Sequence, residues 1–166
     1  MKRIARFEEV TKEQFCAGYA DCFGEDGSEV YETIKLPRRA TSGSAGYDIC
    51  TPRALTLRPG ETVKVPTGLR VYIEDGWVLK LYPRSGLGFK YRLQLNNTVG
   101  IIDSDYYYAD NEGHIFVKVT NDSNEEKTLT LEAGDAFAQG VFVEYGITFD
   151  DDADGVRRGG FGSTGK

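Results

Sequence analysis

The sequence predicts an all-β protein, folded as a sandwich, jelly roll or barrel, with one helix near its N-terminus. Most of the chain after residue 30 consists of short runs that alternate apolar and polar residues between turn residues, which is typical of antiparallel strands. No helical pattern lies between consecutive strands, and this disfavours a parallel α/β sheet. The length of 166 residues suits a single domain with a substantial core.

The helix is predicted over about residues 11–23. Thr11 and Gln14 have the spacing of a capping box, which starts a helix by satisfying its first backbone N–H groups. Four apolar residues then recur at helical spacing, namely Phe15, Tyr19, Cys22 and Phe23. We expect this stripe to pack on the β core, and the alternative is a docking face for a partner protein.

Eight strands are predicted in the rest of the chain, at 30–36, 54–57, 61–65, 69–73, 77–81, 114–120, 127–131 and 136–144. Turns rich in Gly, Pro, Asn and Asp separate them. The strands and the helix form one predicted domain over residues 1–149. An acidic hinge and a Gly-rich, flexible tail follow over residues 150–166.

Composition excludes several classes of function. The formal net charge of −6 argues against general binding to nucleic acid, but it leaves room for a small anionic substrate held by a few cations. Three cysteines without metal-site spacing indicate reduced, mostly buried thiols in a cytoplasmic protein. His114 is the only histidine, so one chain cannot supply a His-based triad or a multi-His metal site.

The last ten residues hold four glycines, two hydroxyls, three cations and one aromatic ring. Free backbone N–H groups, hydroxyls and cations suit a polyphosphate, and Phe161 can stack on a base. The alternative is a disordered tail without a ligand.

Two internal segments also carry polar groups at the ends of predicted strands. Arg84 and Ser85 follow a strand and precede a short helical turn predicted over 87–93, where a hydroxyl, amides and a guanidinium can hold an anion. The alternative is an N-cap Ser beside a surface Arg. Asp103 follows an apolar run and is a candidate base that orients a water, with an ordinary turn Asp as the alternative.

Five segments in this order resemble the deoxyuridine triphosphatase (dUTPase) family in its trimeric all-β form. They are AGYDI at 45–49, PRSG at 83–86, GIIDSDY at 100–106, GDAFAQ at 134–139 and GGFGSTG at 159–165. The resemblance implies a jelly-roll or distorted β-barrel fold of the β-clip type. It also implies a homotrimer with sites at the subunit interfaces, and hydrolysis of dUTP to dUMP and pyrophosphate with Mg2+. That reaction keeps uracil out of DNA and supplies dUMP for thymidylate synthesis.

The same resemblance implies a role for each matching residue. Asp103 is expected to activate the attacking water. Tyr106 is expected to lie under the deoxyribose and to exclude a 2′-hydroxyl. Asn97 lies beside the uracil, whose edge is read by backbone groups of the hairpin that holds Gly100 and Ile102.

The remaining implied contacts involve the phosphates, the metal and the tail. The phosphate ligands are Arg84, Ser85, Gly86 and Gln139. Asp48 is similar to the acid that holds metal-bound waters. In the tail, Phe161 is expected to stack over the uracil, Ser163 and Thr164 to bind the γ-phosphate, and Gly162 to contact the substrate. An arginine of the tail is a further implied phosphate ligand. That arginine is expected to be Arg157, with Arg158 as the alternative, because the spacing departs from the family's pattern here.

A second departure is an insertion of residues 107–113 after Tyr106. We expect a surface insertion without further effect, and an altered trimer contact is the alternative. Two other functions stay open. One is a dCTP deaminase, which shares the fold but needs a Glu in the catalytic hairpin. The other is a regulatory module in which nucleotide occupancy controls a protein partner.

Overall fold

The computed structural model describes residues 1–160 and consists mainly of antiparallel strands, which confirms the all-β prediction. Phe161, Gly162, Ser163 and Thr164, predicted to bind substrate, lie outside the described residues. The strands are β1 (Ala5–Glu9), β2 (Arg38–Arg39), β3 (Tyr47–Cys50), β4 (Leu55–Leu57), β5 (Thr62–Pro66), β6 (Leu69–Ile73), β7 (Trp77–Pro83), β8 (Leu93–Leu95), β9 (Gly100–Ile102), β10 (Phe116–Asn121), β11 (Leu129–Leu131) and β12 (Ala136–Glu144). The helices are α1 (Lys12–Phe23), α2 (Ser28–Tyr31), α3 (Ser85–Tyr91) and the 3-10 helix η1 (Ser104–Tyr108).

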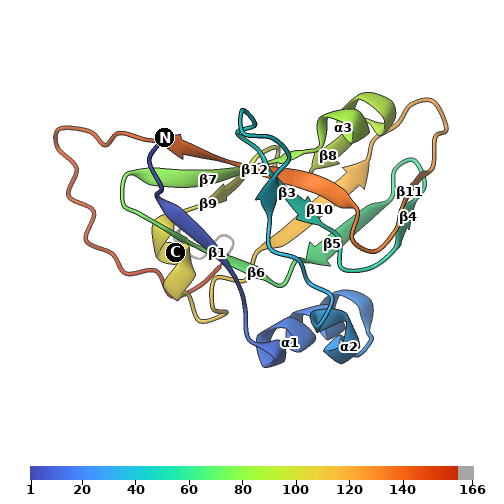
Figure 1. Ribbon diagram of the computed structural model, residues 1–166, viewed down its shortest axis with the longest axis horizontal. Coiled ribbons are helices and arrows are strands. Elements are labelled where there is room, and N and C mark those ends of the chain that lie inside the picture. The colour runs from blue at the N-terminus through green and yellow to red at the C-terminus, as the bar shows by residue number, and fades with distance from the viewer. Residues whose placement is uncertain (161–166) are drawn as a thin grey trace.

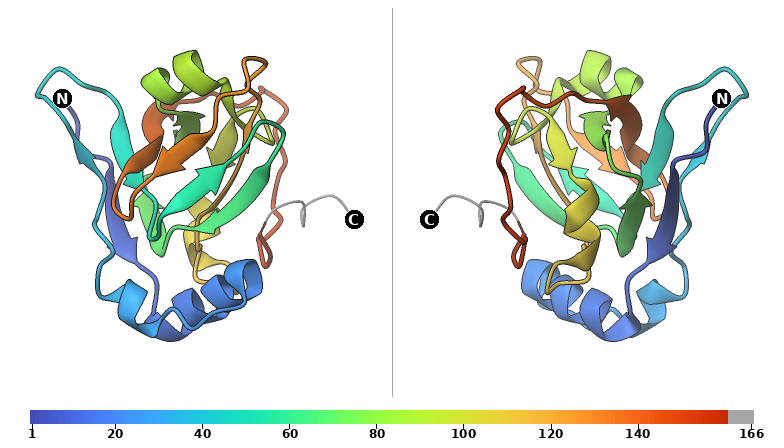
Figure 2. Two further views of the ribbon diagram at one scale, coloured as in Figure 1. Left: turned by 90° about the vertical axis from the view of Figure 1, so that its right-hand side faces the viewer. Right: turned by 90° about the vertical axis from the view of Figure 1, so that its left-hand side faces the viewer.

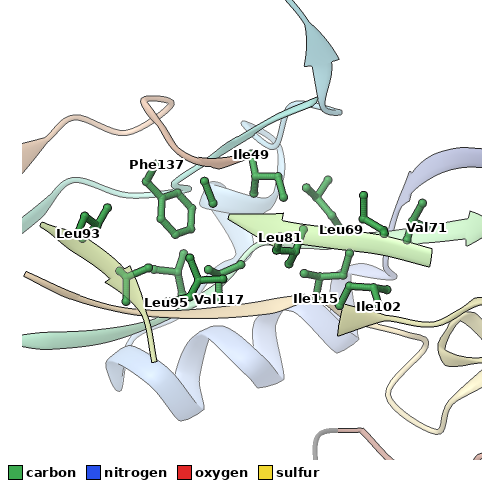
Figure 3. Close-up of a cluster of buried hydrophobic side chains, with 14 of the residues drawn as sticks. Ile49, Leu69, Val71, Leu81, Leu93, Leu95, Ile102, Ile115, Val117 and Phe137 are labelled. Atoms are coloured by element: carbon green, nitrogen blue, oxygen red, sulfur yellow. The ribbon is translucent and has the colours of Figure 1, made fainter. Parts of the chain in front are cut away.

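The largest sheet has the order β2-β3-β12-β7-β9, and a second sheet has the order β5-β10-β8. Helix α3 lies at one end of the molecule, and α1 and α2 lie together at the other end (Figures 1 and 2). The core fills the space among the strands, where side chains such as Leu81, Ile102, Val117 and Phe137 converge (Figure 3). Because inward and outward residues alternate, β4 and β11 bury both leucines of their Leu-Thr-Leu sequences and expose the threonine.

Seven of the eight predicted strands are confirmed, as β4, β5, β6, β7, β10, β11 and β12. The strand predicted at 30–36 is wrong. Helix α2 ends at Tyr31, and the next strand, β2, begins only at Arg38. The apolar residues of this segment, among them Val30 and Ile34, pack on Phe15 of helix α1 instead of joining a sheet. The apolar side chains that predicted a strand therefore pack under helix α1. The Tyr31 hydroxyl also fixes this segment, because it donates to the Val10 carbonyl at 2.7 Å.

Helix α1 begins where the capping box predicts it. Thr11 is the N-cap, and its hydroxyl accepts the Gln14 N–H at 3.3 Å. Phe15 and Tyr19 are buried, so the apolar stripe packs on the protein's own core as expected. Gly18 permits the close approach, since a Cβ there would lie 2.9 Å from Cζ of Phe116.

The three cysteines are free, as predicted, but each is half-buried rather than fully buried. Desolvation raises the pKa of both the Cys22 and the Cys50 thiols, which favours the neutral, unreactive form. None of the helices within residues 1–160 is both long enough and apolar enough to cross a membrane.

His114 is a structural residue in the core. Its side chain is fully buried, and Nε2 accepts the Gly68 N–H at 3.0 Å. Nε2 is therefore the unprotonated nitrogen that accepts this bond, and Nδ1 lies 3.4 Å from the side-chain amide group of Gln14. Burial lowers the pKa of His114 to about 4. The single histidine is thus neutral near pH 7, and its ring contacts both Gly68, before strand β6, and Gln14 of helix α1.

We expect the buried His114 to make folding sensitive to mild acid. Between about pH 6.5 and pH 4 the unfolded chain binds a proton that the folded chain does not, so stability falls as the pH falls. The loss over the whole window is about 3 kcal/mol. Urea unfolding at fixed protein concentration, measured from pH 7 to pH 4, should show this extra slope for the native chain. His114→Gln keeps an acceptor for Gly68 without titrating, so equal slopes for both proteins would contradict the prediction.

Candidate active site

The predicted residues gather in two clusters and one pocket. The first cluster, called the Arg84 cluster, consists of Asp48 on β3, Arg84 after β7 and Gln139 on β12. The β12 strand lies between the other two, and Gln139 is paired with Asp48 on one side and with Tyr82 on the other. Arg84 donates to the Asp48 carboxylate at 2.8 Å. The sheet register therefore brings together three of the predicted sequence segments.

Gly46 leaves room for the Gln139 side chain. A Cβ at Gly46 would lie 2.5 Å from Oε1 of Gln139, so any larger residue there would displace the end of the Gln139 side chain. The Gln139 amide also donates to the Pro83 carbonyl at 3.1 Å, and the Arg84 N–H donates to the Phe137 carbonyl at 3.1 Å. These bonds hold the carboxylate, the guanidinium and the amide at one end of the sheet.

Ser85 and Gly86 begin helix α3 and are both exposed. The helix was predicted over 87–93 and instead spans Ser85–Tyr91. Its N-cap is Arg84, in extended conformation, so Ser85 is the first helical residue and not the cap. The first turn of a helix leaves backbone N–H groups without intrahelical acceptors. The Ser85 hydroxyl and these N–H groups therefore follow Arg84 directly along the chain.

A pocket of about 390 Å3 lies beside the connection between β8 and β9. Asn97 and Gly100, both predicted to contact the base, line it together with the apolar residues Leu81, Leu95 and Val117. Asn97 is exposed at the rim, whereas Gly100 is buried against Leu81. Ile102, two residues further along β9, is a core residue at 2% exposure and is not among the residues that line the pocket.

The second cluster, called the Asp103 cluster, consists of Asp103, Asp105, Tyr106 and Arg157. The Arg157 guanidinium donates to the Asp103 carboxylate at 2.5 Å and to the Asp105 carboxylate at 2.7 Å. It also lies 5.9 Å from the centre of the Tyr106 ring. Arg157 can reach these residues because the segment after β12 runs back along the molecule to η1 (Figure 2). One cation therefore faces two carboxylates from the same loop.

Arg157 and Arg158 contribute in different ways. The side chain of Arg157 is only 16% exposed, whereas Arg158 is an exposed residue whose carbonyl accepts the Asp110 N–H at 3.0 Å. The geometry favours the expectation that Arg157 is the cation of the site. Arg158 instead anchors the tail to the 107–113 insertion through its backbone.

The two clusters lie far apart within one chain. Strand β9 runs antiparallel to β7, and Leu79 is paired with Ile102, so Asp103 is level with Val78. Arg84 lies six residues beyond Val78 along the direction of strand β7, so roughly 20 Å separate Arg84 from Asp103. The Asp103 cluster and the Arg84 cluster therefore cannot contact the same phosphate group within one protomer. The tail behaves differently, because its Arg157 does reach Asp103 of its own chain.

Residues 1–160 contain no group of three or more His, Cys, Asp or Glu side chains placed to hold an ion. Asp48 is the carboxylate of the Arg84 cluster, one-third exposed, and its known partner is Arg84. Such a site fits an ion that takes most of its ligands from phosphate and water, as Mg2+ does.

Sequence reasoning missed three contributors to these clusters. Asp105 shares Arg157 with Asp103, and it was visible only as a second acid in the GIIDSDY segment. Asn111, in the insertion, donates to the Tyr106 hydroxyl at 2.9 Å. Lys64 lines the pocket from β5, and no local pattern linked it to Asn97. Contacts between distant strands leave no signal in a single sequence.

A comparison with protein families and with known proteins gives one consistent result. Residues 32–165 match the family model described as dUTPase. The deoxyuridine 5′-triphosphate nucleotidohydrolase of Lactococcus lactis is 44% identical over 135 residues, covering 80% of this chain and 89% of that protein. The protein of the same name from Hahella chejuensis is 44% identical over 140 residues, covering 80% of this chain and 88% of its own.

The solved structures agree. The crystal structure of dUTPase from Streptococcus mutans superimposes with a TM-score of 0.64 at 37% identity, covering 86% of this chain and 97% of that one.

The different roles of the two arginines predict different effects on the root of the tail. Arg157→Ala removes both contacts to the carboxylates, so we expect the Asp110 amide, which donates to the Arg158 carbonyl, to exchange its hydrogen faster. Arg158→Ala keeps that carbonyl and should leave the exchange unchanged. Amide hydrogen exchange read at Asp110 tests this, and equal rates in the two variants would mean that the Arg157 contacts do not hold the tail.

Proposed function

The chain belongs to the dUTPase family and is a hydrolase of dUTP, and on this premise we propose that it forms dUMP and pyrophosphate by attack of an Asp103-oriented water on the α-phosphorus. The observation that carries this mechanism is the division of the predicted residues into two complementary clusters. The Arg84 cluster supplies cationic and amide donors for phosphates, and the Asp103 cluster supplies a carboxylate beside an aromatic wall.

Asp103 is the base of the proposed reaction. Its carboxylate is 44% exposed, follows strand β9 directly and accepts a hydrogen bond from the Arg157 guanidinium. A triphosphate carries more charge than the two carboxylates and would draw the Arg157 guanidinium onto its own oxygens. The released Asp103 carboxylate can then accept a proton from water and orient it for in-line attack.

Arg84, Ser85, Gly86 and Gln139 are proposed to hold the phosphate chain. Their donors are a guanidinium, a hydroxyl, helix-terminal N–H groups and an amide, which suit the non-bridging oxygens of a phosphate. Negative charge on these oxygens increases as the bond to the leaving pyrophosphate breaks. Donors already fixed by the sheet lower the barrier because they need no reorganisation at that moment.

The pocket beside Asn97 and Gly100 is proposed to hold the uracil. Its floor is apolar and its rim offers backbone groups and an amide, which suits a flat base with polar edges. Tyr106 is proposed to lie under the deoxyribose. The ring is 4% exposed, and a buried apolar wall leaves a 2′-hydroxyl without space or partner. Phe161, Gly162, Ser163 and Thr164 are proposed to close over the base and the γ-phosphate.

Mg2+ is the proposed cofactor, with Asp48 as the residue that holds its water ligands. When bound, the ion offsets the charge of the triphosphate and makes the α-phosphorus more electrophilic. Asp48 also orients Arg84 through their ion pair, so the same carboxylate positions a phosphate donor. A cytoplasmic setting is proposed from the three free thiols.

The proposed assembly is a homotrimer with three shared sites. The separation of roughly 20 Å between the clusters along β7 supports it. In a closed ring, the Arg84 cluster of one protomer can face the Asp103 cluster of its neighbour. Each site is then complete only in the assembly.

Pyrophosphate release from dUTP, compared with UTP, dTTP and dCTP in the presence of Mg2+, tests the reaction. We expect release from dUTP alone, and a loss of at least about a thousandfold in Asp103→Asn, because the amide cannot accept the proton of the water. Absence of release despite tight dUTP binding would support the regulatory module instead. Ammonia released from dCTP would support the deaminase.

Mixed trimers test the shared site. Asp103→Asn and Arg84→Ala should each be nearly inactive alone. After the two variants are unfolded together and refolded at equal amounts, about a quarter of the sites should combine an intact Arg84 with an intact Asp103 from a neighbour. Activity should therefore recover to about a quarter of the native value. Recovery would be absent if each site used one chain only, and the same treatment of either variant alone is the control.

A further inference from the structure

We infer that Asn111, in the insertion that follows Tyr106, is a positioning residue that sets the discrimination between deoxyribose and ribose nucleotides. This inference rests on the proposed function, in which Tyr106 is the wall beneath the sugar. The contacts that carry it are within one chain and do not depend on the assembly.

The hydroxyl of Tyr106 is held from two sides. It donates to the His114 carbonyl at 2.6 Å and accepts from the Asn111 amide at 2.9 Å. Burial also raises the pKa of Tyr106, so the hydroxyl stays protonated and keeps donating. Two opposed hydrogen bonds at the tip of the ring fix both its position and its tilt.

The turn that presents Asn111 is tightly folded against the same tyrosine. The other end of the Asn111 amide, Oδ1, accepts the Gly113 N–H at 3.2 Å. Gly113 has φ +71°, and a Cβ there would lie 2.7 Å from the Tyr106 carbonyl oxygen. Only glycine fits this position. The insertion is thus shaped to bring its own backbone against Tyr106.

Helix α1 fixes the far side of this turn. The Glu112 carboxylate accepts the Thr11 N–H at 2.8 Å and the Thr11 hydroxyl at 2.7 Å. Burial opposes ionisation of Glu112, but the bonds from Thr11 outweigh it and hold the pKa of that carboxyl below its ordinary value. The two parts of the chain outside the common pattern, helix α1 and the insertion, therefore form one support behind Tyr106.

The hydroxyl oxygen is the only polar atom of the Tyr106 side chain, so its hydrogen bonds decide whether a ribose finds a partner there. A tyrosine with a free hydroxyl could turn toward the sugar and offer a partner to a 2′-hydroxyl. With that hydroxyl bound to Asn111 and His114, the substrate meets the ring alone. A ribose must then bury its 2′-hydroxyl without a hydrogen bond, which is costly.

The variant Asn111→Asp tests this role with little other change. It keeps Oδ1 for the Gly113 N–H, so the turn is preserved, but it removes the donor to Tyr106. The matched control is Asn124→Asp, which makes the same chemical change at an exposed position between β10 and β11. The measurement is kcat/KM for UTP divided by kcat/KM for dUTP. Added negative charge affects both triphosphates alike, so it cancels in this ratio.

We expect the UTP-to-dUTP ratio to rise about two- to tenfold in Asn111→Asp, the factor that one hydrogen bond is worth, and to stay unchanged in Asn124→Asp. A merely structural role would lower both activities together and leave the ratio as it is. An unchanged ratio in a folded Asn111→Asp protein, checked by its thermal unfolding, overturns the inference.

Tyr106→Phe supplies a second test through a double-mutant cycle. If Asn111 acts through the tyrosine hydroxyl, adding Asn111→Asp to Tyr106→Phe should not change the ratio further. An equal effect in both backgrounds would contradict the inference. If the native chain hydrolyses no dUTP, the proposed function fails, and the ratio is then read from calorimetric binding of dUMP and UMP. A native chain that binds neither nucleotide overturns both proposals.

Discussion

The antiparallel pairing of β7 with β12 and β9 is the constraint on which the rest of the site depends. Strand β7 ends at the Arg84 cluster, and its beginning is level with Asp103. Because a strand extends about 3.3 Å per residue, this pairing fixes the clusters at opposite ends of one sheet. In the proposed function, a single chain therefore offers each half of the site but not a whole one, and the proposed ring of identical chains would join the halves.

Both halves hold their functional groups as ion pairs. Arg84 is paired with Asp48, and Arg157 is paired with Asp103 and Asp105. Each pair is partly exposed, so it contributes about 0–1 kcal/mol to stability and costs little to break. A substrate with several negative charges can therefore exchange partners with the carboxylates. This arrangement also explains how a chain with net charge −6 can bind a polyanion, since a few cations kept in place by acids are enough.

The parts of the chain outside the common pattern meet in one place. Helix α1 contributes Thr11 and Gln14, and the insertion contributes Asn111 and Glu112. Between them lies His114, buried and neutral, whose backbone carbonyl accepts the Tyr106 hydroxyl. An addition at the N-terminus is thereby connected to the wall of the proposed sugar site through hydrogen bonds and packing.

The sequence alone determined the features that are local. Alternation and turn residues located most strands of four or more residues, since each shows at least two periods of alternation. The capping box located the start of α1. Five strands were not predicted, namely β1, β2, β3, β8 and β9, and the alternation at 30–36 gave a strand where the chain packs beneath a helix. The five sequence segments located the candidate residues, because each segment is short and the segments follow one another in a recognisable order.

Only the tertiary structure decided which of these groups meet. It placed Asp48, Arg84 and Gln139 side by side through the register of β12, and it gave Arg157 rather than Arg158 to the carboxylates. It also turned the insertion toward Tyr106. Such contacts join residues far apart along the chain, 54 positions for Arg157 and Asp103 and 91 positions for the paired Asp48 and Gln139, and they depend on strand pairing and burial over the whole domain. A pattern read within a few residues carries no information about them.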